Sequence, residues 1–255
     1  MTDWTRAKAK QISQLQQKKY RIQYKQFLVE GPKLVKEALL QNRFPVRSII
    51  GTEDFLELLP SKSKNIDFYS VSAREVKKIS SLKNPQGGLA VLDLSSDANL
   101  PEGSFLIYVD ALQNPGNLGT IFRSAEWFGV DGILIGEGTV DPFNSKVVQS
   151  SMGSILRVPF ADCSLDQLEC GMSDYHWVGA DMYGTSIEDM KPTESTILVI
   201  GNEGRGLTEP IENKIQARVS IPQHPSGQAE SLNAALSASI IMYAWSRHKN
   251  NPLSQ

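Results

Sequence analysis

The stretch that most constrains this chain is residues 197–207, where an apolar run ends abruptly in a glycine-rich loop. The run 197–200 is followed by Gly201, Asn202, Glu203, Gly204, Arg205 and Gly206. A short apolar run bounded by glycine is typical of a buried strand in a parallel sheet. In open α/β sheets ligands bind beyond the carboxyl ends of the strands, and glycine lets the backbone approach a ligand closely. The stretch therefore predicts a binding loop at a sheet edge.

Apolar runs and helical periodicity alternate along the whole chain, which predicts an α/β fold. We expect a smaller domain in residues 1–95, a polar linker with Pro and Gly in residues 95–103, and a larger domain in residues 104–255. The larger domain should hold a mainly parallel sheet with helices on both faces. Its expected strands are 105–110, 132–135, 155–159, 176–180, 196–200 and 218–221, and its expected helices are 117–128, 145–151, 165–170, 209–215 and 231–247. In the smaller domain we expect strands 46–50, 67–71 and 89–94, and helices through 34–39, 53–59 and 73–80.

The two ends of the chain carry further expectations. Residues 1–26 have a helical pattern, are basic and contain few apolar side chains, so we expect an exposed, partly flexible arm. The final helix is apolar on two sides, and a helix that is apolar on two sides is buried on two sides. The stripe that we expect to face the core comprises Leu232, Ala235, Leu236, Ser239, Ile240 and Tyr243. The second side comprises Ala234, Ala238, Ile241, Met242 and Trp245. We expect one side to pack on the sheet and the other on a partner subunit, with residues 1–95 as the alternative cover within one chain.

The formal net charge of −2 conceals a strong asymmetry. Residues 1–95 hold 17 Lys and Arg against 9 Asp and Glu, a net charge of +8, and residues 96–255 hold 9 against 19, a net charge of −10. A basic half joined to an acidic half indicates that the first half meets a polyanion, although a solvated lysine-rich surface explains the same count. If the polyanion is RNA, its affinity should fall steeply with salt.

Cysteine usage and hydropathy give no sign of a metal site, a disulfide framework or a membrane span. Cys163 and Cys170 lack metal-ligand spacing, so we expect free, buried thiols in a reducing compartment. The N-terminus is polar, and the most apolar late stretch, 234–245, is too short to cross a bilayer. We therefore expect a cytoplasmic protein with no membrane partner and no metal.

Three loops that follow expected strands carry the residue types of a reactive site. They begin at Asp110, Gly201 and Ile221, and each is rich in Gly, Asn or Pro. Their polar side chains also have simpler structural interpretations. Asn117 and Ser231 can be helix N-caps, Arg123 can pair with Glu126 or stack on Trp127, and Glu203 can be a solvated acid. The glycines match neither the GxGxxG nor the P-loop spacing. Taken together, the three loops favour a binding site more strongly than any one of them does alone.

The segments NPGNLGTIFRSAEWFGV, LVIGNEGRGL and IPQHPSGQAESLNAALSASI resemble, in this order, the three motifs of the SpoU (TrmH-type) family of RNA ribose 2′-O-methyltransferases. More loosely, VEGPKLVKEAL and NPQGGLAVL resemble the N-terminal substrate-binding domain of that family. The resemblance implies an α/β fold with a C-terminal trefoil knot, S-adenosylmethionine as the methyl donor, and a homodimer. It also implies a product with a 2′-O-methylated ribose in ribosomal or transfer RNA. Pro85-Gln86-Gly87 departs from the His-Gln-Gly of many such N-terminal domains.

The resemblance also implies which residues form the site. Those with catalytic roles would be Asn117, Arg123, Glu203, Ser231 and Asn233. Those that bind the cofactor would be Leu198, Ile200, Gly201, Asn202, Gly206, Ile221, Leu232 and Asn233. A guanidinium is a poor base, so we expect Arg123 to hold a phosphate and favour developing negative charge rather than to take the proton of the 2′-hydroxyl.

Two other functions remain open on the sequence. A nucleotide-binding oxidoreductase of doubly wound fold would need GxGxxG after its first strand. A non-catalytic RNA-binding module would account for the basic half, but it would have no use for Glu203 and Arg123 in separate loops.

Overall fold

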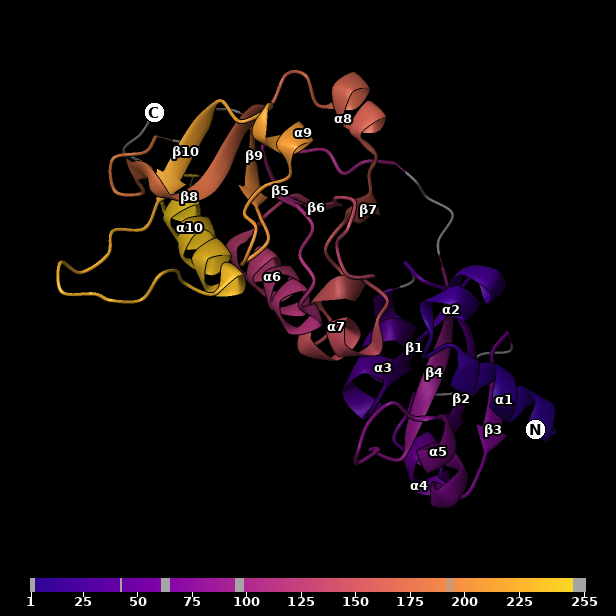
Figure 1. Cartoon of the computed structure of the whole chain (residues 1–255). Helices are drawn as coiled ribbons and strands as arrows, with labels where there is room; N and C mark the ends of the chain where they lie inside the picture. Colours follow the sequence, from indigo (N-terminus) through magenta and orange to yellow (C-terminus); the bar gives the residue numbers. More distant parts are fainter. Residues whose placement is uncertain are drawn as a thin grey trace. The chain divides into compact units, whose positions relative to one another are not determined.

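The computed structural model describes residues 3–41, 43–60, 65–94, 99–191, 193 and 195–249. The chain divides into two compact units (Figure 1). Unit 1 comprises residues 1–97 and 141–157, and unit 2 comprises residues 98–140 and 158–255. The chain therefore passes between the units three times. Residues 95–98 of the expected linker lie outside the described residues.

Unit 1 is built on a four-stranded sheet of order β1-β4-β2-β3. Strand β4 is antiparallel to both of its neighbours, and β2 is parallel to β3. The expected strands and helices of this region are confirmed to within a few residues at their ends. The elements are α1 (Arg6–Gln14), α2 (Lys18–Tyr24), β1 (Gln26–Glu30), α3 (Pro32–Gln41), β2 (Val46–Gly51), α4 (Glu53–Glu57), β3 (Asp67–Ser70), α5 (Ala73–Ile79), β4 (Gly88–Asp93), α7 (Ser145–Ser150) and the 3₁₀ helix η1 (Ser154–Leu156).

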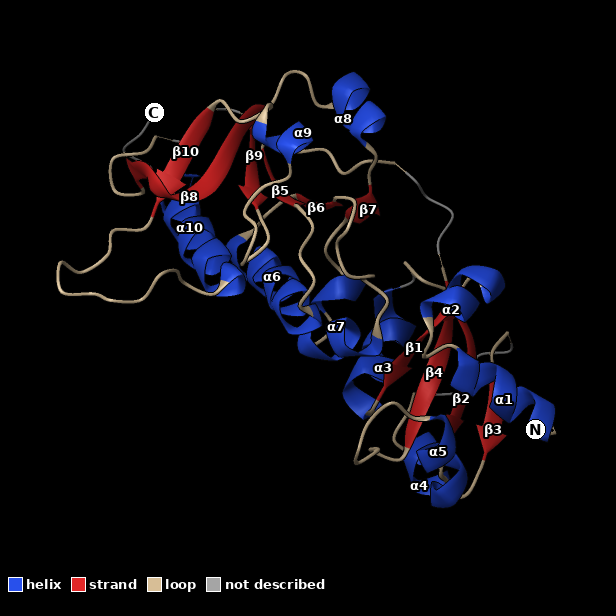
Figure 2. Ribbon diagram, viewed as in Figure 1, coloured by secondary structure: helices blue, strands red, loops and turns tan. Residues whose placement is uncertain are grey.

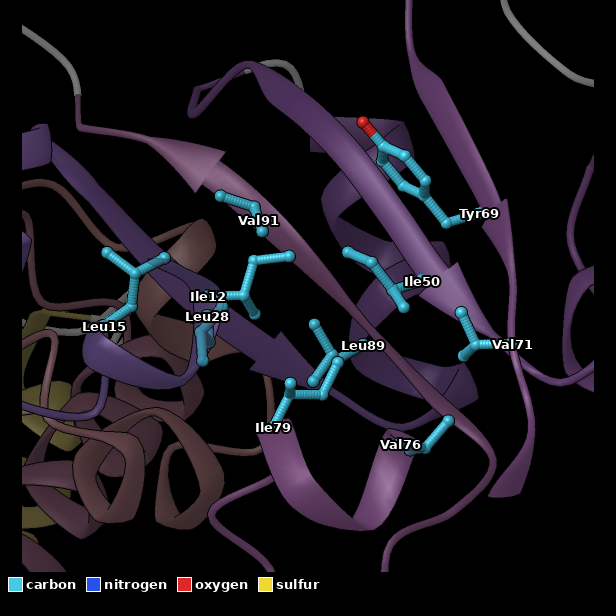
Figure 3. Packing of buried hydrophobic residues seen from close by; sticks show 10 residues of the cluster. All are labelled: Ile12, Leu15, Leu28, Ile50, Tyr69, Val71, Val76, Ile79, Leu89 and Val91. Atoms are coloured by element: carbon cyan, nitrogen blue, oxygen red, sulfur yellow. The ribbon is translucent and has the colours of Figure 1, made fainter. Parts of the chain in front are cut away.

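The N-terminal helices belong to the core of unit 1, so the expectation of an exposed arm was wrong. Ile12 and Leu15 are 1% and 2% exposed, and they pack with side chains of α5 and the sheet (Figure 3). Trp4 adds an edge-on contact with Tyr69 at 5.5 Å between ring centroids. The few apolar residues of this segment suffice because they lie on one side of α1 and its end. Burial of two such side chains stabilises the fold by about 3–6 kcal/mol.

Residues 141–157 come from the second half of the sequence but pack into unit 1. Asp141 pairs with buried Arg21, and Phe143 meets the ring of Phe27 at 4.7 Å between centroids. Further along, Arg157 pairs with Glu37 at 2.6 Å. This docking explains why the strand expected at 155–159 was wrong. Residues 154–156 form η1 instead, and the strand begins later, at Phe160.

Unit 2 holds a six-stranded sheet of order β10-β8-β9-β5-β6-β7 in which every pairing is parallel, as expected (Figure 2). The expected strands 132–135 and 196–200 are confirmed at both ends, and β8 runs six residues past its expected end at 180. The elements are β5 (Phe105–Val109), α6 (Pro115–Phe128), β6 (Gly132–Ile135), β7 (Phe160–Asp162), α8 (Leu165–Gly171), β8 (His176–Ser186), β9 (Thr196–Ile200), α9 (Glu209–Glu212), β10 (Ala217–Ser220) and α10 (Ala234–Lys249).

Helices cover both faces of this sheet. On one face, α8 and α9 contribute Leu168 and Ile211 to a cluster with Ile197 and Val199 of β9. On the other face lie α6 and α10, where Trp245 stacks on Phe105 with ring centroids 5.0 Å apart. Strand β9 is thus buried on both sides, which is why its sequence is a continuous apolar run.

The assignment of the two sides of α10 was wrong. The side that is buried against the sheet and α6 carries Ala234, Ala235, Ala238, Ile241, Met242 and Trp245. Leu232, Leu236, Ile240 and Tyr243 are instead 48%, 55%, 40% and 51% exposed. Small alanines let α10 approach its neighbours closely, so the bulkier stripe is left outward.

Among the described residues, no helix is long and apolar enough to cross a membrane. Within the same residues, no group of three or more His, Cys, Asp or Glu could hold a metal ion. Cys163 is buried, and burial raises the pKa of its thiol to about 12. Cys170 is exposed, so the expectation that both thiols are buried was wrong for this residue.

Candidate functional site

The three loops singled out in the sequence all leave the carboxyl edge of the unit 2 sheet. The first follows β5 and leads into α6, the second follows β9, and the third follows β10 and leads into α10. Strands β5 and β9 are direct neighbours, so their loops start side by side. The third loop projects from the end of β10 and returns to α10, as Figure 1 shows in yellow-orange. Its residues 222–233 are all exposed.

Asn117 joins all three loops. It is 8% exposed in the first turn of α6, and its side-chain nitrogen donates to Oε1 of Glu203 in the second loop. Its Oδ1 accepts a hydrogen bond of 3.0 Å from Nδ2 of Asn233, at the end of the third loop. The three side chains are separated by 86 and 116 residues in sequence, yet they form one chain of hydrogen bonds.

Asn117 is not the cap of its helix, so that structural interpretation was wrong. Asn114 occupies the cap, where its Oδ1 accepts from the backbone N–H of Gly116 at 2.9 Å. At α10 the same role falls to Asn233, whose Oδ1 accepts from the N–H of Ala235 at 3.0 Å. Asn233 therefore caps one helix and contacts the other. Ser231 is exposed, lies three residues before α10, and makes no hydrogen bond with any residue that the structure describes.

The second loop is a closed turn organised by Asn202. The backbone groups of Asn202 and Gly206 make two hydrogen bonds with each other, at 3.0 and 2.9 Å. The side chain of Asn202 accepts from the N–H of Gly204 at 2.9 Å and donates to the carbonyl of Ala111 at 3.0 Å. Asn202 thus holds the second loop to the first. Gly201 has no room for a side chain, because a Cβ there would lie 2.8 Å from the Gly206 carbonyl oxygen. Gly206 itself adopts a φ of +70°, which glycine accommodates without strain.

Asp110 is a structural residue of this edge that the sequence analysis named only as the start of a loop. It is 1% exposed directly after β5, and its carboxylate accepts from the backbone N–H of Thr208 at 2.6 Å and from the Thr208 hydroxyl at 3.1 Å. Burial raises the pKa of Asp110, and the two hydrogen bonds from Thr208 partly oppose that rise. The pairing ties the end of the second loop to β5. The sequence signal that could have identified Asp110 as a structural residue is an acidic residue placed directly after an apolar strand.

Arg123 stands apart from this hydrogen-bonded group. It lies six residues after Asn117 on α6, about 9 Å along the helix axis, and is exposed. Among the described residues it pairs with neither Glu126 nor Trp127, the two structural partners considered for it. Its guanidinium is therefore available to a ligand at the surface of α6.

The remaining predicted cofactor residues surround the same edge. Leu198 and Ile200 are fully buried in β9, which is paired with β5 on one side and β8 on the other, so the structure leaves them little surface for a ligand. Ile221 follows β10 and is half-buried, and Leu232 is 48% exposed beside Asn233. Of the predicted site residues, the structure thus joins Asn117, Glu203 and Asn233 by hydrogen bonds, and Arg123 and Ser231 lie outside that group.

Comparison with known proteins identifies the family to which this arrangement belongs. Residues 104–243 match the SpoU rRNA Methylase family. The chain belongs to this family. Residues 6–90 match the MRM3-like substrate binding domain, so the SpoU family match falls on the second half and a substrate-binding match on the basic half. The resemblance noted in the three sequence motifs is confirmed.

SpoU-family relatives match over nearly the whole chain. The 23S rRNA (guanosine(2553)-2′-O)-methyltransferase RlmP of Bacillus subtilis is 32% identical, over 92% of this chain and 94% of its own. An AdoMet-bound rRNA methyltransferase from Sinorhizobium meliloti superposes with a TM-score of 0.85 at 26% identity, covering 98% of both chains. The SpoU methyltransferase AviRb from Streptomyces viridochromogenes, in complex with AdoMet, gives 0.82 at 26% identity, covering 96% of this chain and 98% of its own.

Proposed function

We propose that this chain transfers a methyl group from S-adenosylmethionine to a ribose 2′-hydroxyl of ribosomal RNA. The observation that carries the proposal is the hydrogen-bonded group in which Asn117 joins Glu203 to Asn233 at the carboxyl edge of the sheet. Membership of the SpoU family and the whole-chain likeness to RlmP support the same reaction. Ribosomal RNA is favoured over transfer RNA because RlmP and the Sinorhizobium meliloti protein, both named for rRNA, match nearly the whole chain.

The residues at the edge suit S-adenosylmethionine. The loop from Gly201 to Gly206 is closed on itself, and at Gly201 a Cβ would fill the space beside the Gly206 carbonyl. Gly204 and Arg205 are exposed, and because their N–H groups donate to Asn202, their carbonyl oxygens are the backbone groups left to accept from an adenosine. When bound, S-adenosylmethionine supplies an electrophilic methyl group on a sulfonium, so a nucleophile can take it directly.

The chain's own residues then have to prepare the hydroxyl. A ribose 2′-hydroxyl is a poor nucleophile at neutral pH, so its proton must be taken or its developing charge stabilised. We assign Arg123 to the neighbouring phosphate, where a planar guanidinium binds two oxygens at once and favours negative charge nearby. Asn117 and Asn233 orient the carboxylate of Glu203. Ser231, exposed and unpaired within the described chain, is free to hydrogen-bond a substrate group.

Wild-type protein incubated with S-adenosylmethionine and unmodified ribosomal RNA should yield a single new 2′-O-methylated ribose. The RNA should come from cells that lack this gene, and mapping of 2′-O-methyl sites identifies the product. Calorimetry with S-adenosylmethionine and with a dinucleotide is the companion measurement. Dinucleotide binding without S-adenosylmethionine binding would favour the oxidoreductase. RNA binding without methyl transfer would favour the non-catalytic module.

We also propose that the protein is a homodimer through the outward side of α6 and α10. The two helices pack on each other, with Ser124 and Ser239 hydroxyls 2.7 Å apart. Their outward side carries Trp127, 83% exposed, together with the exposed Leu236, Ile240 and Tyr243. Several large exposed apolar side chains on two packed helices are typical of an interaction surface, and a two-fold dimer is the commonest closed assembly.

Light scattering should give twice the chain mass of 28.2 kDa for the wild type and one chain mass for Ile240→Lys. The lysine would have to be desolvated at the interface, which is unfavourable. Leu40→Lys is the matched control, because Leu40 is 71% exposed on α3 in unit 1 and should leave the mass unchanged. A wild-type monomer at micromolar concentration would refute the dimer.

Two further proposals follow from the family. We propose that the segment after β10 forms the trefoil knot by threading the second loop. Its support is that the chain must return from the β10 edge of the sheet to α10, whose cap Asn233 contacts Asn117. An experimental density map that traces residues 222–233 outside that loop would refute the knot.

We also propose a cytoplasmic location, where ribosomal RNA is assembled, and cell fractionation tests it.

A further inference from the structure

Strand β8 contains an interruption that the reaction described above does not use. It pairs with β10 through Gly179, opposite Arg218, and then through Thr185, opposite Val219. Arg218 and Val219 are consecutive, so residues 180–184 of β8 have no partner on β10. They form a large bulge, and bulges of this kind re-aim side chains, often beside active sites.

The bulge is held at both ends by side chains of β10. Arg218 donates to Oδ2 of Asp181 at 2.6 Å and also pairs with Glu212 of α9. At the other end, the hydroxyl of Ser220 donates to the carbonyl of Gly184 at 2.8 Å. Gly184 lies so close to β10 that a Cβ there would be 2.6 Å from the carbonyl carbon of Arg218. The bulge is therefore a fixed feature of the sheet and not a loose loop.

At its tip this fixed bulge presents an aromatic side chain to solvent. Tyr183 is 89% exposed, the highest exposure among the large apolar and aromatic side chains that the structure describes, and its neighbour Met182 is 54% exposed. The backbone N–H of Tyr183 donates to Oδ1 of Asp181 at 2.9 Å, so the residue is anchored by its backbone while its ring is left free. A fixed backbone that carries an exposed ring suits a stacking contact, because little backbone conformational entropy is lost on binding.

The register places the bulge at the reactive edge of the sheet. Gly179 pairs with Val199, so Ala180 lies level with Ile200, the last residue before the Gly201–Gly206 loop. Residues 96–255 carry a net charge of −10, so long-range electrostatics does not draw a polyanion to this unit. Stacking of a neutral ring on a base does not depend on charge, and every base offers a face to it.

We propose that Tyr183 stacks on an unpaired base of the RNA substrate beside the ribose that is methylated. The proposal rests on the proposed function and adds a residue that selects single-stranded RNA at the reactive edge. Sequence-selective proteins commonly hold unpaired bases of loops and bulges against aromatic side chains. Asp181 and Arg218 are then positioning residues, because they hold the backbone that carries the ring.

The test compares Tyr183→Ala, Tyr183→Leu and Tyr183→Phe in the full-length protein. The probe is unmodified ribosomal RNA from cells that lack this gene. Tyr183→Ala and Tyr183→Leu should raise KM for RNA about fivefold to a hundredfold, as loss of one base–aromatic stack does. Tyr183→Phe keeps the ring, so its KM for RNA should stay within about twofold of the wild-type value. The S-adenosylmethionine Kd, the thermal midpoint and the mass by light scattering should not change in any of the three.

Each alternative gives a different result. If Tyr183→Leu behaves as the wild type, the contact is apolar and not a stack, and the proposal is wrong. If the S-adenosylmethionine Kd rises with KM, the ring serves the cofactor, which also overturns it. A fall in mass would assign the ring to a subunit interface instead. Absence of methyl transfer by the wild type contradicts the proposed function itself, whereas unchanged KM in an active Tyr183→Ala contradicts only the stacking proposal.

Discussion

Replacing Arg123 with alanine should lower turnover on ribosomal RNA by about a hundredfold or more, as loss of a transition-state donor typically does. Arg123 is exposed on α6, and its guanidinium makes no hydrogen bond or ion pair with a residue that the structure describes. The variant loses no hydrogen bond or ion pair of the guanidinium with a described residue, so thermal stability and S-adenosylmethionine affinity should stay close to those of the wild type. Arg123→Lys should recover only part of the activity, because the planar fork that binds two phosphate oxygens is absent.

Lys191→Ala is the control, since Lys191 is an exposed cation of the same unit that lies between β8 and β9, outside α6 and α10. It should leave kcat unchanged. The measurements are single-turnover kinetics with ribosomal RNA, calorimetry with S-adenosylmethionine, and a thermal melt. Near-normal turnover of Arg123→Ala would show that Arg123 is a surface residue with no role in the reaction. Asn117, Glu203 and Asn233 would then carry the site without it.

Replacing Arg21 with alanine should destabilise unit 1 by about 3–5 kcal/mol, the usual cost of removing one partner of a buried ion pair. Arg21 is 3% exposed, donates from Nε to Asp141 at 2.9 Å, and donates from Nη1 to the carbonyl of Leu15 at 2.8 Å. Without it, the Asp141 carboxylate, 12% exposed, is left without its cation. Lys214→Ala is the control, because the Glu169 partner of Lys214 is 66% exposed and such pairs contribute about 1 kcal/mol or less.

Hydrogen exchange in increasing urea measures this effect separately for peptides of unit 1 and of unit 2. Only unit 1 peptides, including those from residues 141–157, should lose protection in Arg21→Ala. The double variant Arg21→Met with Asp141→Leu should recover most of the loss, since apolar residues of similar volume often replace a buried pair without penalty. Uniform loss of protection in both units, or none at all, would contradict the assignment of residues 141–157 to unit 1.

The same packing bears on how the RNA-binding role of unit 1 is tested. Deletion of residues 1–95 would strip the partners from Phe143, whose ring packs on Phe27 and Phe44, and from Gln149, which donates to the carbonyl of Glu30. The truncated chain would expose a buried segment, so loss of activity would not isolate RNA binding. Charge-reversal variants at exposed lysines of unit 1, read out as the salt dependence of KM, avoid this problem.

The sequence by itself determined the elements whose signals are local. Residues 196–200 are five consecutive non-charged, β-favouring residues that end at a glycine, and they form β9 at those bounds. The three loops were recognisable because Gly, Asn and Pro cluster at the ends of expected strands. The three sequence motifs that contain these loops were sufficient to indicate the family. In the same way, alternation of strands and helices predicted a parallel sheet covered on both faces.

Tertiary structure decided whatever depended on contacts between distant segments. The final helix is apolar on two sides, so its periodicity fits either side against the sheet, and only packing selected the side with Ala238 and Met242. Residues 155–157 were expected in a strand, yet contacts of Asp141, Phe143 and Arg157 with Arg21, Phe27 and Glu37, more than a hundred residues away, hold the segment 141–157 in unit 1. Asn117 could have been a helix cap. It became the centre of the site because Asn114 took the cap and folding brought Glu203 and Asn233 to its amide. Hydrogen bonds across 86 and 116 residues leave no trace in local sequence, because they depend on where the whole chain places their partners.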